Sequence, residues 1–138
     1  MKAKEYLQKI FFLESKINSD RERVRTYKEL AVNKVSKLTP DKIQSTSSKQ
    51  KMADAVCVYS DIEKIIKVDE KKKQEIIDTI SLLTPYESIV LYKCYVDRLT
   101  LKQTAKVICR SYSWVSKKHH DGLNSIQKIL DERENAGD

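Results

Sequence analysis

The sequence predicts an all-α protein in which a long antiparallel, coiled-coil-like helical hairpin precedes three shorter helices. Its 138 residues include only 2 Gly and 2 Pro, too few for the turns of a β-sandwich, a barrel or a Gly-rich nucleotide-binding fold. Charged residues make up 34% and hydrophobic residues 40% of the chain, a balance typical of long amphipathic helices. Seven-residue hydrophobic repeats in the N-terminal part predict helices that pack along a seam.

The hairpin is predicted from two heptad-patterned segments, residues 3–38 and 50–83. A segment rich in Ser between them, at about 39–49, predicts the linker, so residues 1–83 form the first domain. Polar Asp20, Asp69 and Lys73 interrupt the seam, and a polar cluster there fixes register at some cost in stability. The remaining seam positions are Tyr6, Ile10, Leu13, Ile17, Val24, Tyr27 and Ala31 in the first segment, and Met52, Ala55, Tyr59, Ile62, Ile66, Ile76, Ile80 and Leu83 in the second.

Residues 84–133 form the second predicted domain, which begins with a helix over residues 86–97. Thr84 as N-cap, Pro85 at the first helical position and Glu87 at the third all indicate this helix start. A second capping box, Thr100 with Gln103, opens a short helix that ends at Ile108.

The last helix follows a turn at Cys109 and Arg110, with Ser111 as its cap. It is expected to run to about Arg133, and residues 134–138 then form an acidic, frayed tail.

Two helices joined by a tight turn, with a longer and basic second helix, form the helix-turn-helix pattern. Ala105 is small enough to let the two helices approach, and Ile108 and Val115 are expected to face inward. Residues 99–130 hold six basic residues against one acidic residue, Asp121, whereas residues 39–84 are neutral overall. This concentration of positive charge is the arrangement expected for contact with phosphates.

The same residues resemble region 4 of bacterial sigma factors, which binds the −35 promoter element. The resemblance rests on Leu83 to Glu87, Tyr95 to Leu101, Ala105 to Ile108, and Trp114-Val115. The whole chain resembles small phage-encoded proteins of Gram-positive hosts that are related to ArpU-type late transcriptional regulators. In those proteins a helical hairpin precedes a sigma-region-4-like end.

The resemblance implies double-stranded DNA as a partner, contact with bacterial RNA polymerase, and activation of phage late genes. The chain departs from sigma factors at the start of the reading helix, where Tyr112, Ser113 and Trp114 replace an Arg-Glu-Arg run, and Ser116 replaces a further Arg. The ordinary −35 sequence is therefore not implied. Cys109 stands where the turn usually carries Gly, and its Cβ is expected to resist a positive φ.

The candidate base-contacting residues are Tyr112, Ser113, Ser116 and Lys117, which cluster on one face if Val115 points inward. Short hydroxyl side chains allow close approach to base edges, and Lys117 can reach guanine O6 and N7. Trp114 is expected to pack at the domain edge. Candidate phosphate contacts come from Thr100 and Lys102 at a helix N-terminus, and from Arg110 and His120.

Metal, redox and catalytic sites have little support in the sequence. Cys57, Cys94 and Cys109 lie far apart in apolar helical contexts, which predicts reduced cysteines in the core. His119 and His120 are adjacent and point about 100° apart on a helix, so they do not form the i, i+4 pair that metal sites favour. A Gly-rich phosphate loop, an H-E-x-x-H motif and a nucleophile elbow are all missing from the sequence. We therefore expect no enzyme, no metal and no cofactor.

The sequence predicts a DNA-binding transcriptional regulator in the cytoplasm of a bacterial host cell, with the hairpin as an arm for homodimerisation or for polymerase contact. The start of the chain does not resemble a secretion signal, and its apolar runs are far shorter than the ~20 residues of a membrane span. Two alternatives from other classes stay open: a protein-interaction adaptor that acts through the hairpin, and the DNA-recognition subunit of a phage packaging motor.

Overall fold

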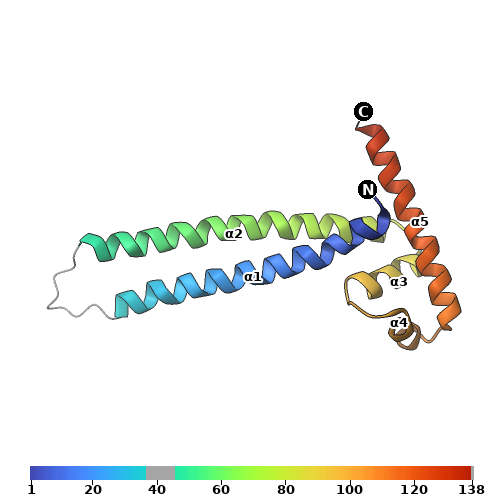
Figure 1. Ribbon diagram of the computed structural model, residues 1–138, viewed down its shortest axis with the longest axis horizontal. Coiled ribbons are helices and arrows are strands. Elements are labelled where there is room, and N and C mark those ends of the chain that lie inside the picture. Colours follow the sequence, from blue (N-terminus) through green and yellow to red (C-terminus); the bar gives the residue numbers. More distant parts are fainter. Residues whose placement is uncertain (37–45, 138) are drawn as a thin grey trace. The chain divides into compact units, whose positions relative to one another are not determined.

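The computed structural model describes residues 1–36 and 46–137, with side chains described for 1–32 and 52–137. Its secondary structure over these residues is entirely helical, which confirms the predicted all-α class. Figure 1 shows the long helices α1 and α2 and the shorter helices that follow them in the chain. They are α1 (Ala3–Ser36), α2 (Thr46–Ser81), α3 (Pro85–Tyr95), α4 (Leu101–Ile108) and α5 (Tyr112–Ala136).

The chain divides into two compact units, and both long helices contribute to each. The hairpin unit comprises residues 14–71, and the helical body comprises residues 1–13 and 72–138. The first turns of α1 and the last turns of α2 thus group with α3, α4 and α5. A unit of about 50 residues is only marginally stable alone because it buries a small fraction of its surface, and the ends of the hairpin helices add apolar side chains to its core.

The hairpin unit is held by the predicted heptad seam. Ile17 and Val24 from α1 pack with Ile62 and Ile66 from α2, and Tyr27 and Tyr59 cover the edges of this cluster. Met52, which the repeat places in the seam, is 38% exposed. The helices run antiparallel, as two ion pairs show: Arg21 with Glu70, and Lys28 Nζ at 3.0 Å from Glu63 Oε1.

Two carboxylates interrupt this seam at the predicted positions, Asp20 and Asp69, and both are buried. Lys16 Nζ lies 3.0 Å from Asp69 Oδ2. This contact is an ion pair without the geometry of a hydrogen bond, because Asp69 Oδ2 has no hydrogen bond within the described residues. A charged pair in an apolar seam disfavours slipped registers, since slippage would leave the buried carboxylate unpaired.

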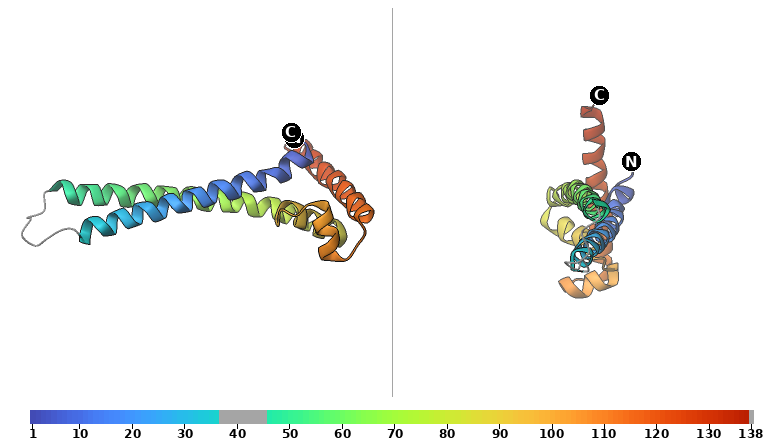
Figure 2. Two further views of the ribbon diagram at one scale, coloured as in Figure 1. Left: turned by 60° about the horizontal axis from the view of Figure 1, so that its bottom comes forward. Right: turned by 90° about the vertical axis from the view of Figure 1, so that its left-hand side faces the viewer.

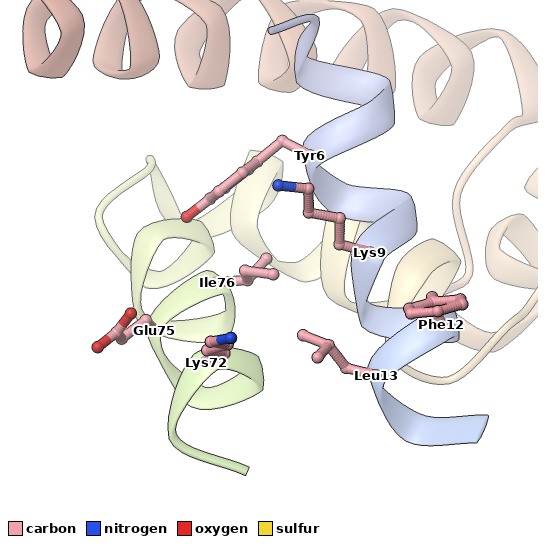
Figure 3. Close-up of a pocket in the computed structure, with 7 residues that line it drawn as sticks. All are labelled: Tyr6, Lys9, Phe12, Leu13, Lys72, Glu75 and Ile76. Carbon is pink, nitrogen blue, oxygen red and sulfur yellow. The ribbon is translucent and has the colours of Figure 1, made fainter. Parts of the chain in front are cut away.

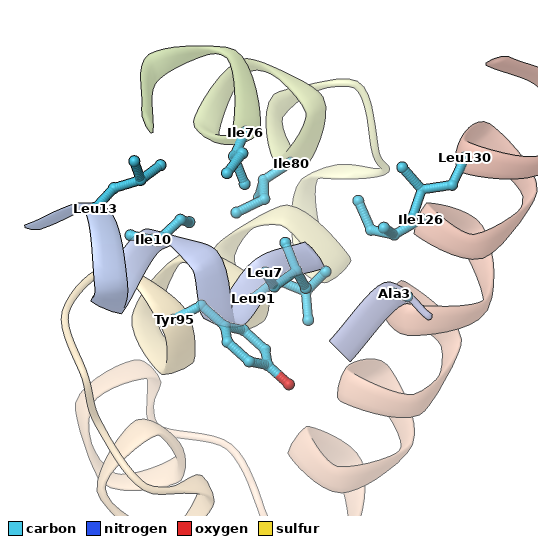
Figure 4. Packing of buried hydrophobic residues seen from close by; sticks show 10 residues of the cluster. All are labelled: Ala3, Leu7, Ile10, Leu13, Ile76, Ile80, Leu91, Tyr95, Ile126 and Leu130. Atoms are coloured by element: carbon cyan, nitrogen blue, oxygen red, sulfur yellow. The ribbon is translucent and has the colours of Figure 1, made fainter. Parts of the chain in front are cut away.

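The helical body has its core where four helices meet. Figure 4 shows side chains from α1, α2, α3 and α5 pointing into one cluster. Burying one Leu or Ile side chain fully contributes about 1.5–3 kcal/mol, so these contacts hold α3 and α5 to the ends of the long helices. The fully buried members are Leu7, Ile10, Ile80, Leu91 and Ile126.

The helix starts agree only in part with the predicted caps. Pro85 opens α3 as expected, but Thr84 makes no side-chain cap hydrogen bond. The Glu87 carboxylate lies 3.2 Å from Ser125 Oγ, which also has Asp121 O as an acceptor at 3.1 Å. The second capping box forms in full: Thr100 Oγ1 accepts from Gln103 N–H at 3.1 Å, and Gln103 Oε1 accepts from Thr100 N–H at 3.0 Å.

Two predicted boundaries shift. Helix α2 begins at Thr46, within the linker expected at about 39–49, whose first part lies outside the described residues. Helix α5 continues to Ala136, so most of the expected frayed tail is helical. Glu134 in this last turn pairs with the amino group of Met1, with 3.3 Å between Oε1 and N.

Candidate nucleic-acid interface

The α4–α5 pair is positioned by a small apolar core of its own. Val115 from α5 packs with Ala105 from α4 and Val90 from α3, and Val90 and Val115 are fully buried. The inward orientation predicted for Ile108 and Val115 is confirmed, since Val115 is fully buried and Ile108 is partly buried against this cluster. Thr104, also fully buried, places its Oγ1 3.6 Å from Cys94 Sγ, so its hydroxyl has a polar partner inside this core. The left-hand view of Figure 2 shows α4 leading through a short turn into α5.

The turn between these helices uses a left-handed residue that is not glycine. Cys109 adopts φ 57° and ψ 45°, in contrast to the expectation that its Cβ would resist a positive φ. The turn is held by backbone hydrogen bonds, since Arg110 N–H donates to Ala105 O at 3.0 Å. Ser111 then caps α5, and its Oγ accepts from Trp114 N–H at 3.2 Å.

The four candidate base-contacting residues lie on the first turns of α5. Tyr112 is 51% exposed, Ser113 and Lys117 are exposed, and Ser116 is half-buried. Because Val115 between them is fully buried, the four side chains share the outer side of the helix, spaced as i, i+1, i+4 and i+5. A phenol, two hydroxyls and an ammonium group are thereby presented together at a helix N-terminus.

The candidate phosphate-contacting residues surround this face. The side chains of Lys102 and His120 are both exposed. Thr100 is exposed too, but its hydroxyl oxygen is engaged in the capping box, which leaves the first N–H groups of α4 as the donors there. Arg110 is exposed, with its guanidinium over the rings of Tyr86 and Trp114, 5.7 and 5.0 Å from their centroids.

Trp114 packs at the edge of the helical body, as predicted. Its ring meets the ring of Tyr86 edge-on at 5.4 Å between centroids, and Lys118 Nζ lies 5.8 Å from its centroid. Sequence reasoning missed Tyr86 and Lys118 as neighbours of the turn. The proximity of Tyr86 depends on how α3 crosses α5, and the local sequence pattern contains no signal for that crossing. Lys118 lies four residues after Trp114 on the same helix, and this spacing could have identified it.

His119 belongs to the core side of α5. Its ring stacks on Tyr95 at 5.7 Å between centroids, and Nε2 lies 3.0 Å from Tyr95 Oη. Burial lowers the pKa of His119, and the positive charges of Lys4 and His120 lower it further. Burial also raises the pKa of Tyr95. The two side chains therefore form a neutral hydrogen-bonded pair near neutral pH.

The cations around the α4–α5 turn are not neutralised by carboxylates. Within the described residues, Lys102, Lys106, Arg110 and Lys117 form no ion pair. On α1, by contrast, Arg21 and Lys28 pair with glutamates of α2. The unpaired cations leave a positive field at the face that carries Tyr112 and Ser113.

A groove in the helical body is separate from this face. It lies between the start of α1 and the end of α2, and Figure 3 shows its lining side chains. Phe12 at its rim is 71% exposed. The lining is mostly apolar with two lysines and one glutamate, and includes none of the predicted site residues: Tyr6, Lys9, Phe12, Leu13, Lys72, Glu75 and Ile76.

The cysteines differ from the prediction. All three are free thiols, but Cys57 and Cys109 are exposed, and only Cys94 is partly buried. Cys57 lies on the outer side of α2, and Cys109 occupies the left-handed turn. Burial raises the pKa of the Cys94 thiol, which the hydrogen bond with Thr104 partly offsets.

Among the described side chains, no group of three or more His, Cys, Asp or Glu is placed to hold a metal ion. None of the helices in the described ranges is long and apolar enough to cross a membrane. Comparison with protein-family models, curated proteins and solved structures finds no match to this chain.

Proposed function

We propose that this protein binds double-stranded DNA through the first turns of α5 and regulates transcription. The observation that carries the proposal is the cluster of unpaired cations around a helix-turn-helix whose second helix presents Tyr112, Ser113 and Lys117 to solvent. An exposed helix of this kind fits the major groove, which is wide enough to admit it.

Each side chain has a distinct role in this proposal. Lys117 reads guanine O6 and N7, the Ser113 and Ser116 hydroxyls approach base edges closely, and Tyr112 contacts a thymine methyl group. Lys102, Arg110, His120 and the free N–H groups at the start of α4, next to Thr100, contact phosphates and fix the position of α5 on the duplex.

The biological setting follows from the sequence resemblance to phage late regulators and to sigma factor region 4. On that basis the protein acts in the cytoplasm of a bacterial host, at phage promoters, and contacts RNA polymerase. The helical body carries the DNA-binding residues, whereas the hairpin unit contributes none of them.

The salt dependence of binding tests this proposal. If about five phosphates are neutralised, the logarithm of the binding constant falls with the logarithm of salt concentration with a slope near −4.5. Fluorescence anisotropy of the full chain with a labelled random-sequence duplex measures this slope. Lys102→Ala should weaken binding to all sequences and reduce the slope by about 0.9.

Lys67→Ala is the matched control, because Lys67 is an exposed lysine on α2 of the hairpin unit. It should leave both the affinity and the slope unchanged. A slope near zero for the parent protein, or an equal loss of affinity for Lys67→Ala and Lys102→Ala, would refute DNA binding by the α4–α5 face.

A further inference from the structure

The two flanks of the hairpin seam are chemically different. On one flank, the residues lie four positions after Ile17, Val24, Tyr59 or Ile66 of the seam. Here the ion pairs Arg21–Glu70 and Lys28–Glu63 join the helices. On the other flank, the residues lie six positions after Ile10, Ile17, Val24, Met52 or Tyr59 of the seam. Two of them, Lys16 and Arg23 on α1, pair with the buried aspartates of the seam. The other three are apolar and uncovered: Leu30 is 45% exposed, Val58 38% and Ile65 46%. These two sets lie on opposite sides of the seam in a heptad pattern. We call Leu30, Val58 and Ile65 the apolar flank.

The apolar flank widens the hydrophobic stripe of α2 beyond that of a two-stranded coiled coil. Two paired helices need apolar residues at two positions of each heptad, whereas a helix inside a larger bundle carries a third. Val58 and Ile65 occupy this third position on α2. The seam itself buries few large apolar side chains, and Asp20 and Asp69 take two of its positions. The hairpin unit thus has the pattern of half a bundle.

The charges beside the apolar flank indicate which partner completes it. On the outer surface of α2, Asp54 and Asp61 lie toward the N-terminal end, and Lys64 and Lys71 lie toward the C-terminal end. None of these four forms an ion pair among the residues whose side chains are described. Their order gives α2 an acidic half followed by a basic half along one face.

A second copy of α2 satisfies both the apolar and the charged residues if it runs antiparallel. A two-fold axis near residue 62 brings Val58 beside Ile65 of the other copy, Asp61 beside its Lys64, and Asp54 beside its Lys71. A parallel pair would instead place like charges together. Self-complementarity about a two-fold axis is the defining property of an isologous dimer interface.

We propose that the apolar flank binds a second copy of this chain, with α2 antiparallel to α2, so that two hairpin units form a four-helix bundle. The proposal does not depend on DNA binding. It identifies the hairpin unit as the dimerisation element, and the paired charges on α2 set the direction of the pairing.

Sedimentation velocity of the full chain over a range of concentrations tests the proposal. The parent protein should dimerise, and Val58→Asp or Ile65→Asp should raise the dissociation constant at least about tenfold, since each buries two unpaired charges at a symmetric interface. Val56→Asp is the matched control. Val56 is 36% exposed on the same helix. Because it lies two residues from Val58, its side chain faces nearly the opposite way, so the dissociation constant of the Val56→Asp dimer should lie within about twofold of the parent's.

Charge reversal distinguishes an antiparallel pair of copies from other arrangements. Asp61→Lys alone places a new ammonium group beside Lys64 of the other copy, twice per dimer, and should weaken the dimer by about tenfold or more. The double variant Asp61→Lys with Lys64→Asp restores opposite charges and should recover most of the affinity. Circular dichroism of each variant checks helix content, and the charge variants give the readout if an apolar-to-Asp variant loses helix.

Three results would overturn the proposal. The first is a parent protein that stays monomeric at tens of micromolar. The second is a dimer that tolerates Val58→Asp and Ile65→Asp or is equally sensitive to Val56→Asp. The third is a charge-reversed double variant that remains as weak as Asp61→Lys.

Discussion

The guanidinium of Arg110 lies over the indole ring of Trp114, 5.0 Å from its centroid. This contact joins the helix-turn-helix turn to the first turn of α5. We therefore expect Arg110→Ala to lower the free energy of unfolding by about 0.5–1 kcal/mol, the usual strength of an exposed cation–π contact. Urea unfolding monitored by the fluorescence of Trp114, the single tryptophan of the chain, measures the change.

Lys106→Ala is the control for this variant, since Lys106 is an exposed cation on the neighbouring helix. It should leave stability within about 0.5 kcal/mol of the parent, as is usual for a surface substitution. Equal stability of Arg110→Ala and the parent would show that the ring contact contributes nothing to the turn.

Gly122 lies where α5 packs against Leu91 of α3. A Cβ at this position would lie 3.0 Å from Leu91 Cδ1 and 3.1 Å from Leu91 Cγ, and Leu91 is fully buried. Gly122→Ala should destabilise the protein by about 1–3 kcal/mol, in spite of the ~1 kcal/mol that alanine gains over glycine inside a helix. At Gly137 an added Cβ meets only ordinary contacts, so Gly137→Ala should have little effect. A more stable Gly122→Ala protein in thermal unfolding would contradict close packing of α5 on Leu91.

Because the backbone of Cys109 is left-handed, a glycine substitution should change stability in opposite directions at Cys109 and at Cys57. Cys109→Gly removes a Cβ penalty of about 1–2 kcal/mol and should stabilise the protein by about 1 kcal/mol after the entropy cost of glycine. Cys57 is also exposed, but it lies inside α2, so Cys57→Gly should destabilise by a similar amount. Equilibrium unfolding of both variants gives the signs. The same sign for both would mean that Cys109 does not hold this conformation.

The lowered pKa of His119 predicts a loss of stability in acid. Because its folded-state pKa lies below the ordinary value of 6.5, the unfolded chain binds this proton at a higher pH than the folded chain does. The free energy of unfolding should therefore fall as the pH drops below about 6.5 and level off below the folded-state pKa.

His119→Gln should flatten this dependence, so its difference in stability from the parent is smaller at pH 5.5 than at pH 7.5. His120→Gln removes the neighbouring imidazole, which is exposed, and should retain most of the parent's pH dependence. Urea titrations at the two pH values measure the effect. A His119→Gln protein with the parent's full pH dependence would exclude His119 as its source.

Most of the fold could be predicted because burial in paired helices has a short, regular period. Ile17, Val24, Ile62 and Ile66 were predicted from seven-residue spacing, and all are buried. The prediction that Met52 lies in the seam is wrong, since Met52 is exposed and the repeat does not indicate where the seam ends. The capping box expected between Thr84 and Glu87 does not form, since Thr84 makes no side-chain cap hydrogen bond. The Glu87 carboxylate faces Ser125, 38 residues away, and local spacing contains no information about that neighbour.

The candidate site could be predicted as a helix face but not as an assembled surface. The burial of Val115 fixes which side of α5 is outward, and this follows from helical periodicity. The positions of Arg110 and Tyr86 depend on the crossing of three helices. The left-handed conformation of Cys109 comes with the backbone hydrogen bonds that end α4, such as Arg110 N–H to Ala105 O, and these outweigh the intrinsic preference of a residue with a Cβ. The exposure of Cys57 was missed because its apolar neighbours Val56 and Val58 are themselves exposed.

Selection of duplexes from a random pool by the full chain, at a low and a moderate salt concentration, tests the central claim that the outer side of α5 reads DNA. We expect an enriched sequence at moderate salt, and a dimeric hairpin further predicts inverted half-sites one or more helical turns apart. Replacing Ser116 and Lys117 together by alanine should abolish the enrichment while binding at low salt persists. Absence of binding by the parent protein at low salt, or the same enriched sequence for the double variant, would contradict this claim.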